Sequence, residues 1–105
     1  MVTIAAPGDY GKPRPAVLIQ SDYFNDTHAS ILVCPFTTSR VDAPLFRLDV
    51  APSETNGLEA HSQIMIDKVI TMRRDKIGRR IGRLDDETML AVNRSLTLFL
   101  GLGDR

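Results

Sequence analysis

Several residue types that build common functional sites are scarce in this chain. Among its 105 residues there is no tryptophan, one cysteine and two histidines. The single cysteine, Cys34, excludes an internal disulfide, and together with His28 and His61 it matches no spacing of zinc ligands. Cys34 lies in the apolar run Ile31–Cys34, so we expect it to be buried and inert, and we expect both histidines at the surface. The sequence therefore predicts no metal site and no cofactor.

Long apolar runs are also missing. No stretch approaches the roughly 20 apolar residues that a membrane-spanning helix needs. Met1–Pro7 has no basic segment and too short an apolar run for a secretory signal peptide. We therefore expect a cytoplasmic protein without membrane association, organised as one domain over residues 1–105. Because so small a domain buries a modest core, we expect dimerisation or a partner to add stability.

The chain has no net charge, but its charges are unevenly distributed. The 13 basic and 13 acidic residues cancel over the whole sequence. Between Lys68 and Arg83, however, seven basic residues accompany one acid, a local charge of plus six, which leaves minus six for the rest. A basic segment of this kind is suited to binding phosphate groups, and a solvated turn with flexible arginines is the alternative. The charge pattern alone does not favour either interpretation.

Apolar patterning predicts five or six short strands. The second and third in chain order are continuous apolar blocks, which are typical of strands buried on both faces. The fourth alternates apolar and polar residues, as a half-buried strand does. The predicted strands are Val2–Ala6, Arg14–Ser21, Ala29–Phe36, Leu45–Val50, Ser62–Asp67 and Val69–Met72.

A C-terminal amphipathic helix is predicted over Asp86–Leu100, with short helical turns at Asp22–His28 and within Arg73–Gly82. Asp85 is a suitable N-cap, because its carboxylate can accept the unpaired amide protons of the first turn. Glycines that can adopt the left-handed conformation follow the helix. Its apolar face comprises Met89, Val92, Leu96, Phe99 and Leu100. The pattern predicts a mainly β fold, a small and strongly bent sheet or barrel with this helix packed on it.

Three stretches of the chain resemble the MazF/PemK family of toxins. Gly11–Asp22 is similar to a loop-to-strand signature in which an arginine-proline pair precedes an apolar strand ending in Gln and Asp. Val33–Thr38 resembles the strand that ends in a catalytic threonine or serine. Ser62–Lys68, followed by Thr71 and the approach Ile81–Asp85 to the last helix, is the third. The likeness covers nearly the whole chain in the expected order.

The resemblance implies a fold, an activity and a partner. The fold is an SH3-like barrel with a C-terminal helix, in a homodimer whose interface groove takes single-stranded RNA. The activity is that of a sequence-specific endoribonuclease that needs no metal, uses the 2′-hydroxyl as nucleophile and leaves a 2′,3′-cyclic phosphate and a 5′-hydroxyl. The partner is a cognate antitoxin whose disordered, acidic tail folds over the groove.

The resemblance assigns the catalytic positions to Arg14 and Thr37. A guanidinium group is planar and permanently charged and can hold two phosphate oxygens, and the prolines on both sides of Arg14 should stiffen its backbone. Thr37 is a poor base, so we expect it to position the phosphate or the 2′-hydroxyl. Without the resemblance, a surface arginine and a backbone-capping threonine are the preferred interpretations. Further RNA contacts are expected from Lys12, Thr38, Ser39, Arg40, Asp67 and Lys68.

Some alternatives remain open at this stage. Asp67 could accept from a base edge or orient Arg14, and a solvated Asp67–Lys68 pair at a strand end is the alternative. Met65 stands where some relatives carry an arginine, so a catalytic scheme that uses this arginine does not carry over. A CcdB-type toxin that binds DNA gyrase is a second hypothesis, but such toxins use a tryptophan-containing C-terminus that this chain lacks. An inactive relative that only binds RNA or an antitoxin is a third.

Overall fold

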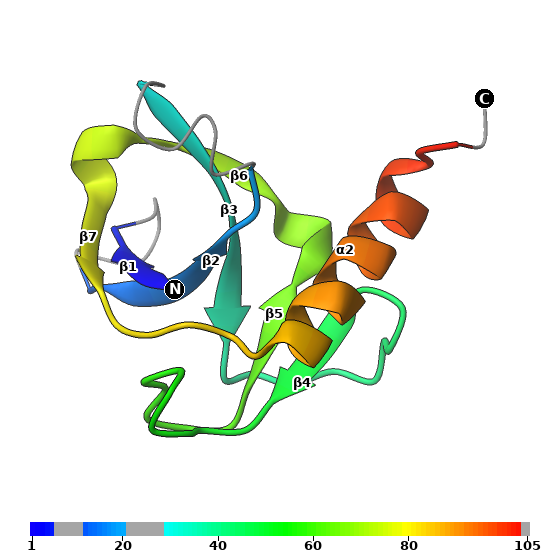
Figure 1. Cartoon of the computed structure of the whole chain (residues 1–105), viewed down its shortest axis with the longest axis horizontal. Coiled ribbons are helices and arrows are strands. Elements are labelled where there is room, and N and C mark those ends of the chain that lie inside the picture. Colours follow the sequence, from blue (N-terminus) through cyan, green and yellow to red (C-terminus); the bar gives the residue numbers. More distant parts are fainter. Residues whose placement is uncertain (6–11, 21–28, 104–105) are drawn as a thin grey trace.

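The longest strand, β3 (Ser30–Thr37), organises the sheet because it pairs with three other strands. The structure is a computed structural model and describes residues 1–5, 12–20 and 29–103. The first half of β3 pairs with β6 (Ile70–Arg73), its middle with β2 (Arg14–Leu18) and its last residues with β5 (Ser62–Met65). Since β3 changes partners along its length, the sheet bends strongly around it (Figure 1).

The remaining strands extend the sheet in both directions. On one side β2 pairs with β1 (Val2–Ile4), which pairs in turn with β7 (Ile77–Arg80). On the other side β5 pairs with β4 (Arg47–Val50). All pairs are antiparallel, in the order β4-β5-β3-β2-β1-β7 with β6 beside β3. The predicted mainly β architecture with one C-terminal helix is confirmed.

The described part of the chain contains seven strands, one or two more than predicted. Strand β7 has no clear apolar pattern, because it reads IGRR and three of its four residues are exposed. It lies at an end of the sheet, where pairing with β1 stabilises it without burial of its side chains. Strand β2 is also less buried than its apolar sequence suggests, since only Ala16 and Val17 are fully covered.

All six predicted strands are present, with ends that lie at most three residues from the predicted ones. The predicted strand Ser62–Asp67 ends at Met65, and the chain continues as the 3₁₀ turn η1 (Ile66–Lys68). The helical turn expected after β6 is confirmed as the 3₁₀ turn η2 (Arg74–Lys76). The turn predicted at Asp22–His28 lies outside the described residues.

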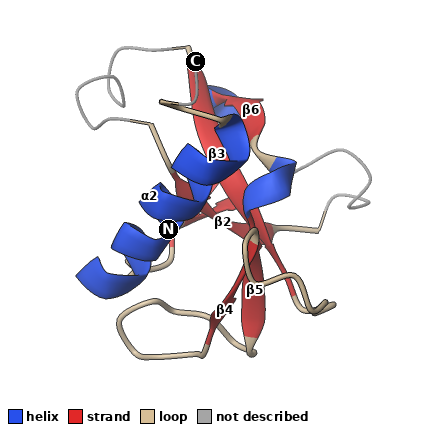
Figure 2. Cartoon of the chain, turned by 90° about the vertical axis from the view of Figure 1, so that its right-hand side faces the viewer, coloured by secondary structure: helices blue, strands red, loops and turns tan. Residues whose placement is uncertain are grey.

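The helix α2 (Asp86–Leu100) has the predicted bounds and the predicted cap. The Thr88 amide donates to Asp85 Oδ1 at 2.7 Å, and the helix ends at Gly101, whose φ of 68° is left-handed. Helix α2 crosses the sheet on the side of η1 and β4 (Figure 2). Its predicted apolar face is buried at Val92 and Leu96, whereas its C-terminal end is exposed, with Phe99 48% accessible.

Two apolar clusters fill the space inside the bent sheet. The larger joins β3 and β5 to α2 and centres on Phe36, Ile64, Ile66, Val92 and Leu96. The smaller lies between β1, β2, β3 and β6 and contains Ile4, Ala16, Ile31, Val33 and Met72. Cys34 is fully buried in the larger cluster, as predicted, and this burial raises the pKa of its thiol to about 12. Among the described residues, no helix has the length and apolar character needed to cross a membrane.

Candidate functional site

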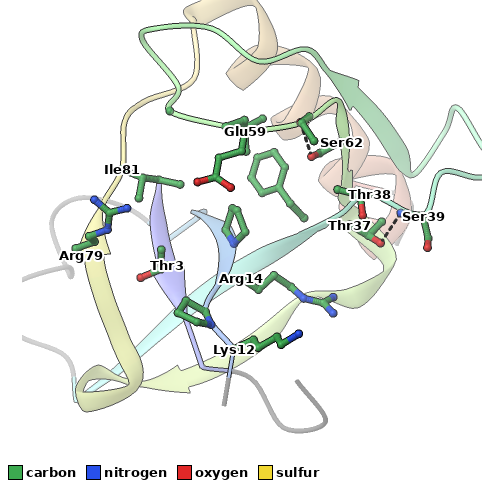
Figure 3. A pocket seen from close by; sticks show the side chains of 16 residues that line it. Thr3, Lys12, Arg14, Thr37, Thr38, Ser39, Glu59, Ser62, Arg79 and Ile81 are labelled. Carbon is green, nitrogen blue, oxygen red and sulfur yellow. Dashed lines mark hydrogen bonds between the residues drawn. The ribbon is translucent and has the colours of Figure 1, made fainter. Parts of the chain in front are cut away.

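A cavity of about 660 Å³ opens where the start of β2 meets the end of β3 (Figure 3). Segments far apart in the sequence line it: residues 12–15, residues 36–39 and the connection between β4 and β5. Thr3 of β1 and Arg79 of β7 complete the opposite side. A cavity built from strand ends and loops, with both apolar and polar side chains in its lining, is typical of a binding site.

The sheet register brings Arg14 and Thr37 together. In the β2–β3 pair, Ala16 lies opposite Pro35 and Leu18 opposite Val33. Arg14 is the first residue of β2 and Thr37 is the last residue of β3, so this antiparallel pairing puts both residues at the same end of the two strands. Both side chains are partly buried and line the cavity. A permanent cation and a hydroxyl group therefore stand side by side at its edge (Figure 3).

The hydroxyl of Thr37 is oriented by the turn that follows β3. The amide of Ser39 donates to Thr37 Oγ1 at 3.1 Å, which occupies one lone pair and leaves the hydroxyl proton to be donated. The buried side chain of Gln63 fixes the next residues of this turn. It accepts from the Val41 amide at 3.0 Å and donates to the Val41 carbonyl at 2.9 Å. The turn is thus held at both ends, which preorganises Thr37.

The cavity has an excess of positive charge. Its lining includes three cationic side chains, Lys12, Arg14 and Arg79, and one acidic side chain, Glu59. Figure 3 shows Lys12 and Arg14 together on one side, while Glu59 enters from the other. A cavity with this charge and an available hydroxyl proton is suited to holding a phosphate diester.

The structure gathers five of the eight predicted site residues at the cavity. Lys12, Arg14, Thr37, Thr38 and Ser39 all line it. The other three do not: Arg40 is exposed just beyond the turn, and Asp67 and Lys68 lie in η1, on the side of the sheet that faces α2. RNA contacts at these three positions stay predictions.

Asp67 pairs with Arg47 and not with Arg14. It forms a two-point ion pair with Arg47, in which Nε donates to Oδ1 at 2.8 Å and Nη2 to Oδ2 at 3.1 Å. The hydrogen bonds from Arg47 hold the pKa of Asp67 below its ordinary value, and the same bonds raise the pKa of Arg47. Both side chains are mostly covered, with 13% and 19% of their surface accessible. This pair fastens η1 to β4, so Asp67 does not orient Arg14.

Arg79, Glu59 and Thr3 are among the cavity residues that were not predicted as site residues. Arg79 is one of several cations in the basic segment, and nothing in the sequence distinguishes it from its neighbours. Glu59 and Thr3 carry no local signal, because only the folded chain brings the β4–β5 connection and β1 to the cavity. Met65 is buried in β5, and the exposed His61 does not line the cavity. His28 lies outside the described residues.

The described residues contain no group of three or more histidine, cysteine, aspartate or glutamate side chains that could hold a metal ion.

Comparison with known proteins gives consistent matches over nearly the whole chain. Residues 2–100 match the family described as the PemK-like, MazF-like toxin of type II toxin–antitoxin systems. A protein of Mycolicibacterium smegmatis named probable endoribonuclease MazF is 48% identical over 95% of this chain and 92% of its own length. Endoribonuclease EndoA of Bacillus subtilis is 28% identical over 91% of this chain and 83% of its own length.

Solved structures show the same fold. The toxin MazF-mt6 of Mycobacterium tuberculosis superposes with a TM-score of 0.80 at 22% identity, covering 97% of this chain and 98% of its own. A mycobacterial endoribonuclease, solved in complex with its cognate antitoxin, superposes with a TM-score of 0.76 at 24% identity, over 96% and 91% of the two chains.

Proposed function

Because the chain belongs to the PemK-like, MazF-like family of toxins of type II toxin–antitoxin systems, we propose that it cleaves single-stranded RNA in the cavity between β2 and β3. Endoribonuclease is the activity named for its 48% identical relative and for the relative from Bacillus subtilis. The protein is thus an endoribonuclease toxin. The observation that supports this active site is that Arg14, at the start of β2, and Thr37, at the end of β3, both line one cationic cavity.

The proposed reaction is an intramolecular transesterification, in which a phosphate ester of the RNA passes from the 5′-oxygen to the 2′-oxygen. The 2′-oxygen attacks the adjacent phosphorus as its proton is removed, a bond between this oxygen and phosphorus forms, and the bond to the 5′-oxygen breaks. The 5′-oxygen takes up a proton, so the products are a 2′,3′-cyclic phosphate and a 5′-hydroxyl, and no metal ion is required. The transition state carries extra negative charge on the non-bridging oxygens, and stabilising this charge is commonly the largest catalytic contribution.

Arg14 and Thr37 supply this stabilisation in the proposed mechanism. The guanidinium group of Arg14 donates to two non-bridging oxygens, and its charge matches the charge that develops on them. Thr37 donates its hydroxyl proton to one of these oxygens, since its lone pair already accepts from Ser39. Lys12, Thr38 and Ser39 hold the neighbouring backbone of the RNA.

The partners follow from the same family. We propose that a cognate antitoxin with a disordered acidic tail competes with RNA for the cationic cavity, and that two copies of the chain form a homodimer beside it. Four large apolar side chains are exposed at the end of α2, Leu98, Phe99, Leu100 and Leu102, at 48% to 59% accessibility, which supports a covered surface there. Since its RNA substrate is cytoplasmic, we place the protein in the cytoplasm.

The two alternative functions are less well supported. A gyrase-binding toxin of the CcdB type would need the tryptophan-containing C-terminus that this sequence lacks. An inactive relative would not need a cation and a hydroxyl at one cavity, and Arg14 and Thr37 provide both. Met65, which replaces an arginine of some relatives, is a core residue here, so Arg14 carries the charge stabilisation on its side of the cavity.

Removal of Arg14 tests this function. Purified protein is incubated with a long single-stranded RNA in EDTA, and the new ends are mapped. We expect wild-type cleavage in EDTA, with 2′,3′-cyclic phosphate and 5′-hydroxyl ends. Arg14→Ala should lower the rate roughly 10²–10³-fold, because a preorganised donor to the transition state is lost. Arg14→Lys should recover part of it, since an ammonium group restores charge without the two-point geometry.

The matched control is Arg94→Ala, which removes an exposed arginine on α2 that does not line the cavity. It should cleave like the wild type. If Arg14→Ala cleaves as fast as Arg94→Ala, then Arg14 is not catalytic, and if the wild type does not cleave in EDTA, the proposed metal-independent reaction is wrong.

A further inference from the structure

One acidic side chain projects into the cationic cavity. Glu59 lies in the connection between β4 and β5, and Figure 3 shows its carboxylate directed into the cavity from the side away from Lys12 and Arg14. Among the described residues it has no ion-pair or hydrogen-bond partner. An unpaired carboxylate in a site for a polyanion weakens phosphate binding, so a donor group of the ligand must compensate for it.

The loop that carries Glu59 is rigid. The buried side chain of Asn56 accepts from the Ser53 and Leu58 amides at 3.0 and 2.9 Å and donates to the Ala51 carbonyl at 2.9 Å. Ser53 Oγ accepts in return from the Asn56 amide at 3.0 Å. Leu58, next to Glu59, is buried in the main core with 8% of its surface accessible. The backbone that carries Glu59 is therefore held by the fold, and the exposed side chain starts from a defined place at the rim of the cavity.

Close backbone packing holds this loop against the segment that follows β7. The Arg83 amide donates to the Thr55 carbonyl at 2.9 Å. A Cβ at Gly57, whose φ is 71°, would lie 2.1 Å from the Ile81 carbonyl oxygen, so only glycine permits the approach. This contact brings Glu59 to the side of the cavity that Arg79 and Thr3 also line.

We propose that Glu59, together with Arg79 and Thr3, forms a base-reading edge that selects an RNA base bearing an exocyclic amino group, cytosine, adenine or guanine, over uracil. This proposal rests on the proposed function and specifies which bases the cleavage would prefer. An ionised carboxylate only accepts hydrogen bonds, and each of these three bases offers it an amino group. Uracil offers a single N3–H between two carbonyl oxygens, which repel the second carboxylate oxygen. Arg79 and Thr3 supply donors for the acceptors next to the amino group.

The placement of Glu59 favours a base over the reacting ribose. The attacking 2′-oxygen must lie within about 3–3.5 Å of the phosphorus, and a group that takes its proton must be in hydrogen-bond reach of it. The phosphorus is held by Arg14 and Thr37, on the other side of the cavity from Glu59 (Figure 3). A base attached to the same backbone extends away from the phosphate, so it can reach this opposite side.

The test replaces Glu59 by its neutral isostere. Glu59→Gln and the wild type are given an RNA pool randomised over the cleaved region, and the cut sites are sequenced. The wild type should prefer amino-bearing bases over uracil about tenfold at one position, and Glu59→Gln should reduce this preference to about twofold. The reason is that a glutamine amide both donates and accepts, so it also binds the O4 of uracil. Glu54→Gln, an exposed acid of the same loop that does not line the cavity, should keep the wild-type preference.

A second measurement uses 2′-O-methyl RNA, which binds but has no nucleophile. Fluorescence anisotropy with oligonucleotides that differ only between cytosine and uracil at the selected position should show the same preference and the same loss in Glu59→Gln. An unchanged preference in Glu59→Gln overturns the proposal. So does equal loss of cleavage on every sequence with unchanged binding, which would make Glu59 the proton acceptor instead. If the wild type cleaves no RNA, the proposed function fails, and the binding preference still decides the role of Glu59.

Discussion

The ion pair between Arg47 and Asp67 offers a quantitative test of the interpretation that Asp67 is structural. Substitution Asp67→Asn keeps the size of the side chain and removes its charge. Of the two hydrogen bonds, at 2.8 and 3.1 Å, one is then lost because asparagine has a single acceptor oxygen, and the other loses its charged acceptor, while the side chain of Arg47 stays mostly covered with only 13% of its surface accessible. Each hydrogen bond to a charged group contributes roughly 1.5–3 kcal/mol, and an exposed pair contributes near zero. For a pair that is mostly covered, we expect a loss of about 2 kcal/mol in the free energy of unfolding.

This loss should depend on pH in a defined direction. The folded-state pKa of Asp67 is lowered, so the carboxylate contributes stability above the pKa of an aspartate in the unfolded chain, roughly 4, and loses it as the pH falls through the lowered folded value. The stability difference between wild type and Asp67→Asn should therefore be full at pH 7. It should shrink progressively below about pH 4.

Urea unfolding monitored by circular dichroism measures this difference at each pH. The matched control is Asp75→Asn, whose carboxylate accepts from Arg73 at 2.7 Å with 60% and 76% of the two side chains accessible. It should change the stability by less than about 0.5 kcal/mol. Equal losses in the two variants would refute the argument from burial. A folded Asp67→Asn that cleaves RNA much more slowly than the wild type would show that Asp67 contacts RNA after all.

Two further predictions concern a buried side chain, Cys34, and a constrained backbone position, Gly57. Because the pKa of Cys34 is raised to about 12, its thiol should not react with iodoacetamide in the native protein at pH 8, and it should react once guanidinium chloride unfolds the chain; mass spectrometry measures both. Gly57→Ala should lower the urea midpoint more than Gly103→Ala, because both positions have positive φ but only Gly57 meets a carbonyl oxygen; equal midpoints would contradict this.

The helix was predictable because its signals are local. The N-cap at Asp85, the spacing of its apolar residues and the terminal glycine all lie within one stretch of sequence, and the observed bounds are the predicted ones. The end of β5 could not be predicted in this way, because Ile66 continues the apolar pattern although the chain already turns there. The turn after the strand is held by the pairing of Asp67 with Arg47, which lies 20 residues earlier in the chain. No window of the sequence around Asp67 contains this information.

Some residues of the candidate site could be predicted from local sequence, and others could not. Arg14 and Thr37 could be assigned from the resemblance, since each lies in a recognisable motif at a strand end. Their proximity depends on the register between β2 and β3, which the sequence does not state. Glu59 had no motif at all, because a loop rich in proline, asparagine and glycine predicts only a turn. It reaches the cavity because Asn56 and Gly57 shape that loop and dock it on the segment after β7.

The basic segment between Lys68 and Arg83 shows what a count of charges can and cannot predict. Its charge of plus six indicated either a phosphate-binding patch or a solvated turn. In the folded chain, some of its basic residues lie at the solvated surface and one lines the cavity. Arg73 and Arg83 form ion pairs with Asp75 and Asp86 at the surface, whereas Arg79 lines the cavity. Since a phosphate contact must release a counterion to contribute, cations already paired with acids add less to RNA affinity than Arg79 does. Within this segment, Arg79 should accordingly contribute more to the salt dependence of RNA binding than Arg73 or Arg83 does.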